Sequence, residues 1–257
     1  MTVKQHSVPR MIMKRHAAVI VPPKKKNKNP KYYLYLHNKK TKENNLVDIY
    51  DIGYEKYLYE LRDESGNILE GSENQIEKIF ACLEGKWSPI LDKVKRDEQL
   101  TEEDEGLLYA LIALQILRTP QMLETVQIFL KEVRPTLTDA EAERYARISG
   151  LVAGKITEEV NFILNMTLEI ILKRNLVVYH SNIPFIFDKD CLIFGESITG
   201  EKEHINMYFP FDKYTCIGLM VGIPKNNIMI LPDNYVKWLN SIVYNNAEKY
   251  VCSSTKL

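Results

Sequence analysis

The spacing of apolar residues changes twice along this 257-residue chain, and that change limits the folds open to it. Residues 74–173 repeat apolar side chains every three or four positions, as amphipathic helices do. The flanking stretches, 19–50 and 176–231, contain short runs of β-branched and aromatic residues that are typical of strands. Strands and helices in separate blocks indicate an α+β fold.

We therefore predict N-terminal short strands, a central bundle of about five helices, and a C-terminal antiparallel-type sheet closed by a C-terminal helix. The expected strands are residues 19–21, 32–37, 46–50, 176–179, 184–187, 191–194, 206–211, 216–222 and 227–231. The expected helices are residues 74–94, 101–118, 121–133, one that begins at Thr138, 156–173 and 233–252. We expect a single domain over residues 1–257, with possible lobes at 1–70, 71–175 and 176–257.

Two of these helices begin at a capping signature. Thr101 precedes three acidic residues, 102–104, which favour the positive end of a helix dipole. Thr138 lies three residues before Glu141, which is the spacing of a capping box. Pro89 is expected to kink or restart its helix, and Pro120 to end or kink the helix before it.

Charge is balanced over the whole chain but not along it. Lys and Arg total 34, as do Asp and Glu, yet residues 1–44 contain twelve basic residues and one acid. The densest run lies between two predicted strands and reads as a solvated loop; its lysines are Lys24, Lys25, Lys26 and Lys28. Such a run can attract a nucleic-acid backbone, with the neighbouring tyrosines 32, 33 and 35 stacking on bases. Such a run is more often a solvated surface, and the alternative is a solubilising loop beside ordinary strand tyrosines, or one that docks on the chain's own acidic part.

Several classes of protein do not fit the composition. No apolar stretch approaches the roughly 20 residues that span a bilayer, and the first residues lack the apolar run of a signal peptide. The four cysteines are far apart and include no CxxC pair, which argues against a thiolate zinc site and for a reducing compartment. We expect a cytoplasmic protein with no membrane contact and no metal site; the sequence names neither a cofactor nor an oligomeric state.

One helix carries polar residues where burial is expected. Gln115 and Arg118 lie three apart on the most apolar helix, so they share a face. A buried arginine needs a carboxylate or several carbonyls, and Glu84 on the preceding helix is the nearest candidate. Glu84 and Arg118 then form either a structural strut bridged by Gln115 or part of a cleft that grips an anion.

Two histidines are candidates for acid–base chemistry. His6 lies near the N-terminus, in a polar stretch that ends in Pro9 and Arg10. His180 ends a predicted strand and enters a polar turn that contains Ser181 and Asn182. Either imidazole can act as an acid or a base, or simply satisfy local hydrogen bonds.

Three separated stretches resemble a bacterial family known as domain of unknown function 4238. They are His6-Ser7-Val8-Pro9, Leu114-Gln115-Ile116-Leu117-Arg118-Thr119-Pro120, and Ser181-Asn182-Ile183-Pro184. The chain departs from the family pattern at Asn182, where Asp is usual, and at Arg10 and His16, where Gln and Phe are usual. The Asn182 departure weakens any role for a carboxylate at that position.

The resemblance implies that the family's motif positions gather at one site. In this chain those positions include His6, Glu84, Gln115 and Arg118, with Arg10, Ser181 and Asn182 as binding residues. Some family members lie among bacterial anti-phage defence genes, which implies an action on nucleic acid or on a nucleotide.

Two functions follow as hypotheses. The first is a phosphodiester-cleaving or nucleotide-processing effector: His6 is the acid or base, Arg118 stabilises a phosphoryl oxygen, and Gln115 and Asn182 orient the substrate. The second is a non-catalytic protein that binds or senses a nucleic acid or a partner chain. The first requires that the start, the centre and the later third of the chain converge on one solvent-accessible hollow; in the second, the polar residues are structural struts.

Overall fold

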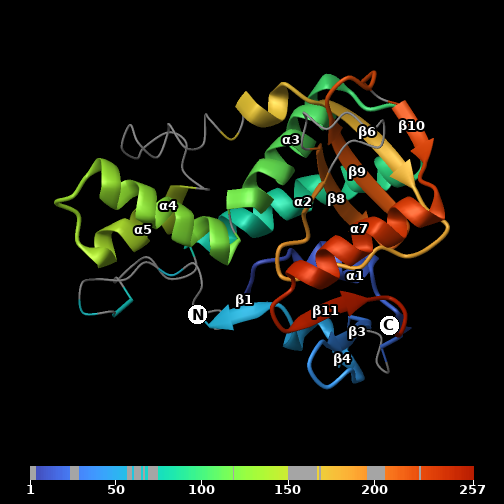
Figure 1. Cartoon of the computed structure of the whole chain (residues 1–257), viewed down its shortest axis with the longest axis horizontal. Coiled ribbons are helices and arrows are strands. Elements are labelled where there is room, and N and C mark those ends of the chain that lie inside the picture. The colour runs from blue at the N-terminus through green and yellow to red at the C-terminus, as the bar shows by residue number, and fades with distance from the viewer. Residues whose placement is uncertain are drawn as a thin grey trace. The chain divides into compact units, whose positions relative to one another are not determined.

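A computed structural model of the chain confirms the α+β class, with helices in the middle and a sheet toward the C-terminus (Figure 1). The structure describes residues 4–23, 29–56, 60, 65, 67–68, 75–117, 119–149, 167, 169–195, 206–225 and 227–257. The chain forms two compact units. Unit 1 is Met1–Ser7, Tyr54–Lys93 and Glu98–Lys173, and unit 2 is Val8–Gly53, Val94–Asp97 and Arg174–Leu257. The single domain over 1–257 stays a prediction.

Unit 1 contains most of the helices. Its elements are β1 (Lys4–His6), β5 (Tyr54–Lys56), α2 (Gln75–Lys95, whose last residues belong to unit 2), α3 (Glu102–Leu117), α4 (Pro120–Val133) and α5 (Asp139–Ser149). The antiparallel pair β1–β5 was not predicted. Most of the helix expected over 156–173 lies outside the described residues. Helix α2 continues through Pro89 without a restart.

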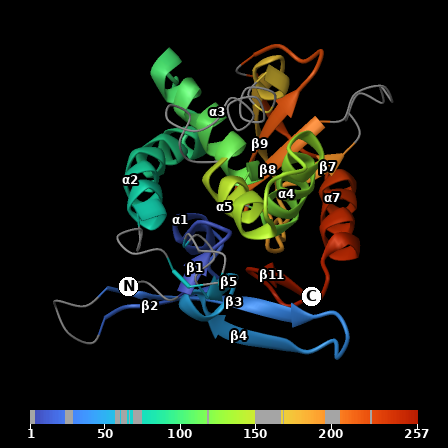
Figure 2. The same cartoon turned by 90° about the vertical axis from the view of Figure 1, so that its left-hand side faces the viewer.

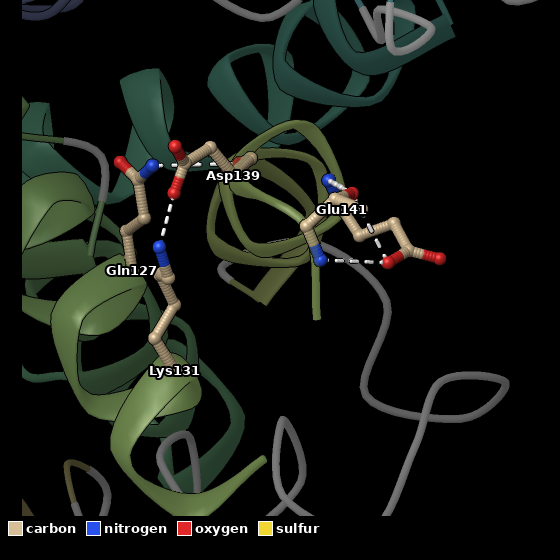
Figure 3. A network of polar contacts seen from close by, with 5 residues as sticks. Gln127, Lys131, Asp139 and Glu141 are labelled. Atoms are coloured by element: carbon tan, nitrogen blue, oxygen red, sulfur yellow. Dashed lines mark hydrogen bonds and ion pairs between the residues drawn. The ribbon is translucent and has the colours of Figure 1, made fainter. Parts of the chain in front are cut away.

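The capping residues act as predicted. Thr101 accepts from the N–H of Asp104 at 3.1 Å, and its own N–H donates to the Asp104 carboxylate at 3.0 Å. Thr138 and Glu141 make the same reciprocal pair at the start of α5 (Figure 3). Thr119 caps α4 with Pro120 as its first residue, so this proline begins a helix.

Helices α4 and α5 pack against each other in unit 1 (Figure 1). Lys131 of α4 forms an ion pair with Asp139 at the start of α5. Val126, Leu130 and Ala146 are buried between the two helices.

Among the described residues, no single helix has the length and apolarity to cross a bilayer. The bent pair 102–117 and 122–133 meets that test by length and composition alone.

The larger sheet of unit 2 has the strand order β10-β6-β9-β8-β7. Its strands are β6 (Asn175–His180), β7 (Ile193–Gly195), β8 (Asn206–Asp212), β9 (Thr215–Met220) and β10 (Asn227–Ile230). All neighbours are antiparallel except β10 and β6, which are parallel, so the predicted antiparallel-type sheet is correct for three of four pairs. One core cluster joins this sheet to helix α7 (Asp233–Asn246).

The expected strand over 184–187 is wrong. Only Phe187 makes a bridge, to Cys252. The side chain of Asn240 on α7 hydrogen-bonds the backbone of this segment instead. It accepts from the N–H of Ile186 at 3.1 Å and donates to the carbonyl of Pro184 at 3.0 Å. A side chain therefore satisfies the groups that a neighbouring strand would have used.

The smaller sheet of unit 2 is built around one long strand. It contains β2 (Val19–Val21), β3 (Lys31–Asn38), β4 (Asn44–Asp48) and β11 (Tyr250–Ser253), and α1 (Arg10–Arg15) and the 3-10 turn η1 (Ile49–Asp51) lie against it. Strand β4 pairs along β3, while β2 and β11 pair with its N-terminal and C-terminal halves (Figure 2).

The C-terminal helix was predicted to reach Cys252 but ends at Asn246. Lys39, from the turn after β3, donates its Nζ to the carbonyl of Asn245 at 3.1 Å. A lysine at this end satisfies orphan carbonyls and opposes the helix dipole. Ala247 is extended, and the chain continues as β11 beside β3.

Candidate functional site

The start of the chain and the helix that carries Gln115 meet in unit 1. Gln115 is buried and donates its Nε2 to the carbonyl of Ser7 at 3.2 Å. His6, the residue before, is also buried, and its ring lies 6.0 Å from that of Tyr54 on β5. The predicted convergence also involves Arg118 and residues 181–182, so the predicted site as a whole stays a prediction.

The other residues of the predicted centre are placed less fully. Glu84 is half-buried on α2, and Arg118 lies outside the described residues. Their ion pair therefore stays a prediction, as do the catalytic roles of His6, Gln115, Glu84 and Arg118.

The predicted binding residues lie in unit 2, apart from the lysine run, which falls outside the described residues. Arg10 is exposed on α1, with its guanidinium 5.1 Å from the ring centre of Tyr50. Ser181 is buried and its hydroxyl closes a tight turn, donating to the carbonyl of Ile183 at 2.6 Å. Asn182 is exposed at the tip of that turn.

His180, directly before that turn, forms a hydrogen bond with a carboxylate. Its Nε2 lies 2.7 Å from Oδ1 of Asp97. An ionised carboxylate only accepts, so Nε2 carries the hydrogen and Nδ1 is left as the basic nitrogen. Nδ1 has no hydrogen-bond partner among the described residues. The two side chains are 27% and 42% exposed, which leaves them accessible to a substrate.

The backbone of His180 is held from both sides. Its carbonyl accepts from the N–H of Leu231 at 2.8 Å, beyond the end of β10. The N–H of Ser181 donates to the carbonyl of Tyr214 at 3.0 Å, at the turn before β9. The imidazole therefore projects from a fixed strand end, as catalytic groups commonly do.

Asp97 is held in an unusual backbone conformation. Its φ is +55°, the left-handed region that favours glycine. The N–H of Asp97 donates to Val94 and the N–H of Glu98 to Lys93, which together form the Schellman motif that ends α2. Glycine is the usual residue at this position, and Asp costs about 1 kcal/mol more there.

A second ion pair joins the same two regions. Lys95, two residues before Asp97, contacts the buried carboxylate of Asp212 at 2.7 Å. Asp212 also accepts from the N–H of Tyr214 at 3.2 Å. Lys95 thus belongs to the segment that carries Asp97, and Lys213 lies in the turn whose Tyr214 carbonyl accepts from the N–H of Ser181.

His16 lies beside this ion pair in the interior of unit 2. Its Nε2 donates to the carbonyl of Pro210 at 2.8 Å, and its Nδ1 is buried without a partner. Burial lowers the pKa of His16 to about 4, against smaller opposing effects of Pro210 and Asp212. His16 is therefore neutral near pH 7 and is a structural residue.

Other titratable groups in unit 2 are buried without forming a centre. Burial raises the pKa of Asp190 to about 6 and that of Cys252 to about 12. Cys191, at φ +52°, and Cys216 have raised pKa values for the same reason. Within the described ranges, no three His, Cys, Asp or Glu side chains gather as metal ligands do.

Sequence reasoning named His180 but missed Asp97. The two residues are 83 positions apart, so no local pattern connects them. The available signal was a helix stop: a helix ending in Lys95 and Arg96 and followed by Asp rather than Gly.

Comparison with known proteins gives the chain a family. No curated protein and no solved structure matches it. A family model described as "Protein of unknown function (DUF4238)" matches residues 4–257, and thus includes both Gln115 and His180. The chain therefore belongs to the DUF4238 family.

Proposed function

We propose that this protein is a phosphodiester-cleaving or nucleotide-processing enzyme in which His180 transfers the proton and Asp97 orients the imidazole. The observation that carries the proposal is the 2.7 Å bond between His180 Nε2 and Asp97, which leaves Nδ1 on an accessible strand end. It moves the acid–base role from His6, which is buried, to a histidine that a substrate can reach.

The chemistry follows from the two nitrogens. His180 Nδ1 accepts a proton from the attacking water while the water oxygen bonds to phosphorus. The bond from phosphorus to the leaving oxygen breaks, and that oxygen takes the proton back from Nδ1. Asp97 stabilises the imidazolium that forms between these steps, as the carboxylate of a catalytic triad does.

Lysines near the pair support an anionic substrate. Lys95 is half-exposed but paired with Asp212, and Lys213, which follows Asp212 in the turn before β9, adds a half-buried cation. Asn182 is exposed two residues after His180, where an amide can orient a phosphoryl oxygen. Asn182 therefore keeps in this proposal the role predicted from the sequence, which is to orient the substrate.

The competing interpretation is that the two pairs only hold the end of α2 against the sheet. An exposed pair such as His180–Asp97 contributes less than about 1 kcal/mol to stability. The non-catalytic hypothesis of a nucleic-acid or partner-binding protein agrees with this interpretation, and the same experiment decides between them.

Asp97→Gly separates catalysis from structure. Glycine suits φ +55°, so the turn is retained and the free energy of unfolding should stay within about 1 kcal/mol of wild type. Phosphodiester cleavage should fall by about 10²-fold or more, because the imidazole loses its orienting partner. Cleavage by the His180→Gln variant should fall by a similar factor, because Gln can still donate to Asp97 but cannot act as a base.

The measurement is cleavage of bis(p-nitrophenyl) phosphate and of labelled single-stranded RNA and DNA, with Mg²⁺, with Mn²⁺ and with EDTA. Asp139→Asn is the matched control, because it removes an exposed, lysine-paired carboxylate from unit 1 (Figure 3). Wild-type cleavage that persists in Asp97→Gly and His180→Gln would refute the assignment. If His6→Ala alone abolishes cleavage in a folded protein, the centre lies in unit 1 instead.

The proposed physiological role is anti-phage defence. Cells that express the wild-type protein should then form fewer phage plaques than cells that express His180→Gln. Equal plaque counts would leave the enzyme proposal standing and remove the defence role.

A further inference from the structure

The small sheet of unit 2 has one face that carries tyrosines and aliphatic side chains into solvent. Residues that are directly opposite in paired strands share a face. The register pairs Val19 with Tyr33, Val21 with Lys31, and Tyr35 with Leu46. We call this set the tyrosine face: Val19, Val21, Lys31, Tyr33, Tyr35 and Leu46.

The tyrosine face is exposed to a degree that is unusual for such residues. Val19, Val21 and Leu46 are 37%, 39% and 46% exposed, and both tyrosines are half-buried. On the same side, Ser253 lies directly opposite Tyr35 and is fully buried, and the chain after it returns to Asn44, which bonds both backbone groups of Leu257. The C-terminal segment thus lies beside Tyr35, while Val19, Val21, Lys31 and Leu46 stay exposed.

Two lysines lie at the tyrosine face. The Lys31 side chain is 66% exposed, and Nζ of Lys256 lies 6.0 Å from the ring centre of Tyr35. One acid, Asp48, shares the face opposite Tyr33 and lies 3.8 Å from Lys31. Its side chain is mostly buried, which leaves the lysine as the exposed charge.

We propose that the tyrosine face binds single-stranded nucleic acid, with bases stacked on Tyr33 and Tyr35 and phosphates held by Lys31 and Lys256. Aromatic rings beside lysines are the composition of single-strand binding surfaces, and the two half-buried rings here are partly accessible. Tyr33 and Tyr35 are two residues apart, so their rings leave the same face about 6.8 Å from each other along the strand. A duplex hides its base faces, so stacking on these rings selects single strands.

This inference rests on the proposed function for the class of partner, and it goes further by naming the surface and the strandedness. The two fail separately, because one is measured by cleavage and the other by equilibrium binding. Asp139→Asn should bind single strands as wild type does, since this exposed residue of unit 1 lies outside both the tyrosine face and the proposed catalytic pair.

The test is fluorescence anisotropy with labelled oligo(dT), oligo(U) and a mixed-sequence duplex, each of about 20 nucleotides, in EDTA. Wild type should bind both single strands at least about tenfold more tightly than the duplex. Affinity should fall linearly with salt on logarithmic axes, with a slope of about −0.7 for each phosphate contact. Lys31→Ser should reduce that slope by about 0.7.

The decisive variant is Tyr33→Leu with Tyr35→Leu, which keeps apolar bulk on the sheet but removes the rings. Affinity for both single strands should fall about 25-fold or more, at about fivefold or more for each ring. The matched control is Tyr250→Leu on β11. Tyr250 is 38% exposed with a lysine over its ring, but it lies opposite Asn38 on the other side of the sheet. Its loss should leave binding unchanged.

Three results would overturn the inference. The first is no binding of either single strand at about 50 mM salt by a protein whose melting curve is cooperative. The second is equal binding by wild type and the double variant, or an equal loss in Tyr250→Leu. The third is binding to vesicles of phosphatidylserine and phosphatidylcholine, or self-association, that the double variant abolishes while oligonucleotides do not bind; this would assign the face to a membrane or to a second copy.

Discussion

The buried His16 gives unit 2 a defined sensitivity to acid. Its side chain is fully buried at the end of α1, its ring centre is 4.7 Å from that of Phe187, and one nitrogen is bonded to the carbonyl of Pro210. Protonation would place a second N–H, on Nδ1, where the structure offers no acceptor. Asp212 attracts the resulting charge, while Lys95 and Lys213 oppose it.

The size of the effect follows from the two pKa values. The folded pKa of His16 is about 4 and its ordinary value is 6.5. Between these values the unfolded chain binds a proton that the folded chain does not, so stability is complete above pH 6.5 and is lost as pH falls toward 4. A difference of about 2.5 units corresponds to about 3 kcal/mol in total, of which about 2 kcal/mol is already lost at pH 5.

His16→Phe should remove this dependence. At pH 7.5 the variant loses a buried hydrogen bond but also an unpartnered nitrogen, so its free energy of unfolding should lie within about 1 kcal/mol of wild type. When the pH is lowered from 7.5 to 5, wild type should lose about 2 kcal/mol more free energy of unfolding than the His16→Phe variant. Urea unfolding at both pH values measures it, and the carboxylates that titrate in both proteins cancel. A difference that does not change with pH would show that His16 is not a neutral, buried residue.

Two further substitutions test the packing of unit 2 by thermal or urea unfolding. Gly218→Ala should cost about 1–3 kcal/mol, because its Cβ would lie 2.3 Å from Met220 and 2.5 Å from the buried ring of Tyr179; an unchanged melting temperature would mean that these side chains move aside freely. Asn240→Leu should cost about 2 kcal/mol or more, since it leaves the carbonyl of Pro184 and the N–H two residues later without their partner, and a loss below about 0.5 kcal/mol would contradict the role assigned to Asn240.

Helices and their first residues could be predicted from the sequence because their signals are local. The apolar spacing that gave residues 74–94 and 121–133 is the spacing that α2 and α4 bury. Thr101 and Thr138 bond to residues only three positions away, so their partners were visible in the sequence. Periodicity and capping are sufficient wherever an element contacts mainly its own neighbours.

The two wrong elements were decided by side chains far along the chain. Residues 184–187 have strand composition, but Asn240 takes their backbone groups. Residues 247–252 continue an apolar pattern, but Lys39 closes the helix and β3 offers a free edge to β11. In both places a long-range hydrogen bond outweighs local propensity, and no window of sequence contains it.

The residues of the candidate site also divide into those that the sequence indicated and one that it did not. Gln115 was found because a polar residue on an apolar helix must have a partner, and the partner is the carbonyl of Ser7. His180 was found as a strand-end residue. Asp97 was not found, because an acid after a helix is an ordinary surface residue until the fold brings it to the imidazole.

The energetics of Asp97 favour a role beyond holding α2 in place. The neighbouring Lys95–Asp212 pair, with a buried acid, already joins the end of α2 to the turn before β9. The exposed His180–Asp97 pair contributes less than about 1 kcal/mol, and the left-handed backbone of Asp97 costs about as much. Glycine would therefore give an equally stable helix end. The Asp97 carboxylate orients the imidazole of His180 and leaves its second nitrogen available. The stability of the helix end does not depend on that orientation.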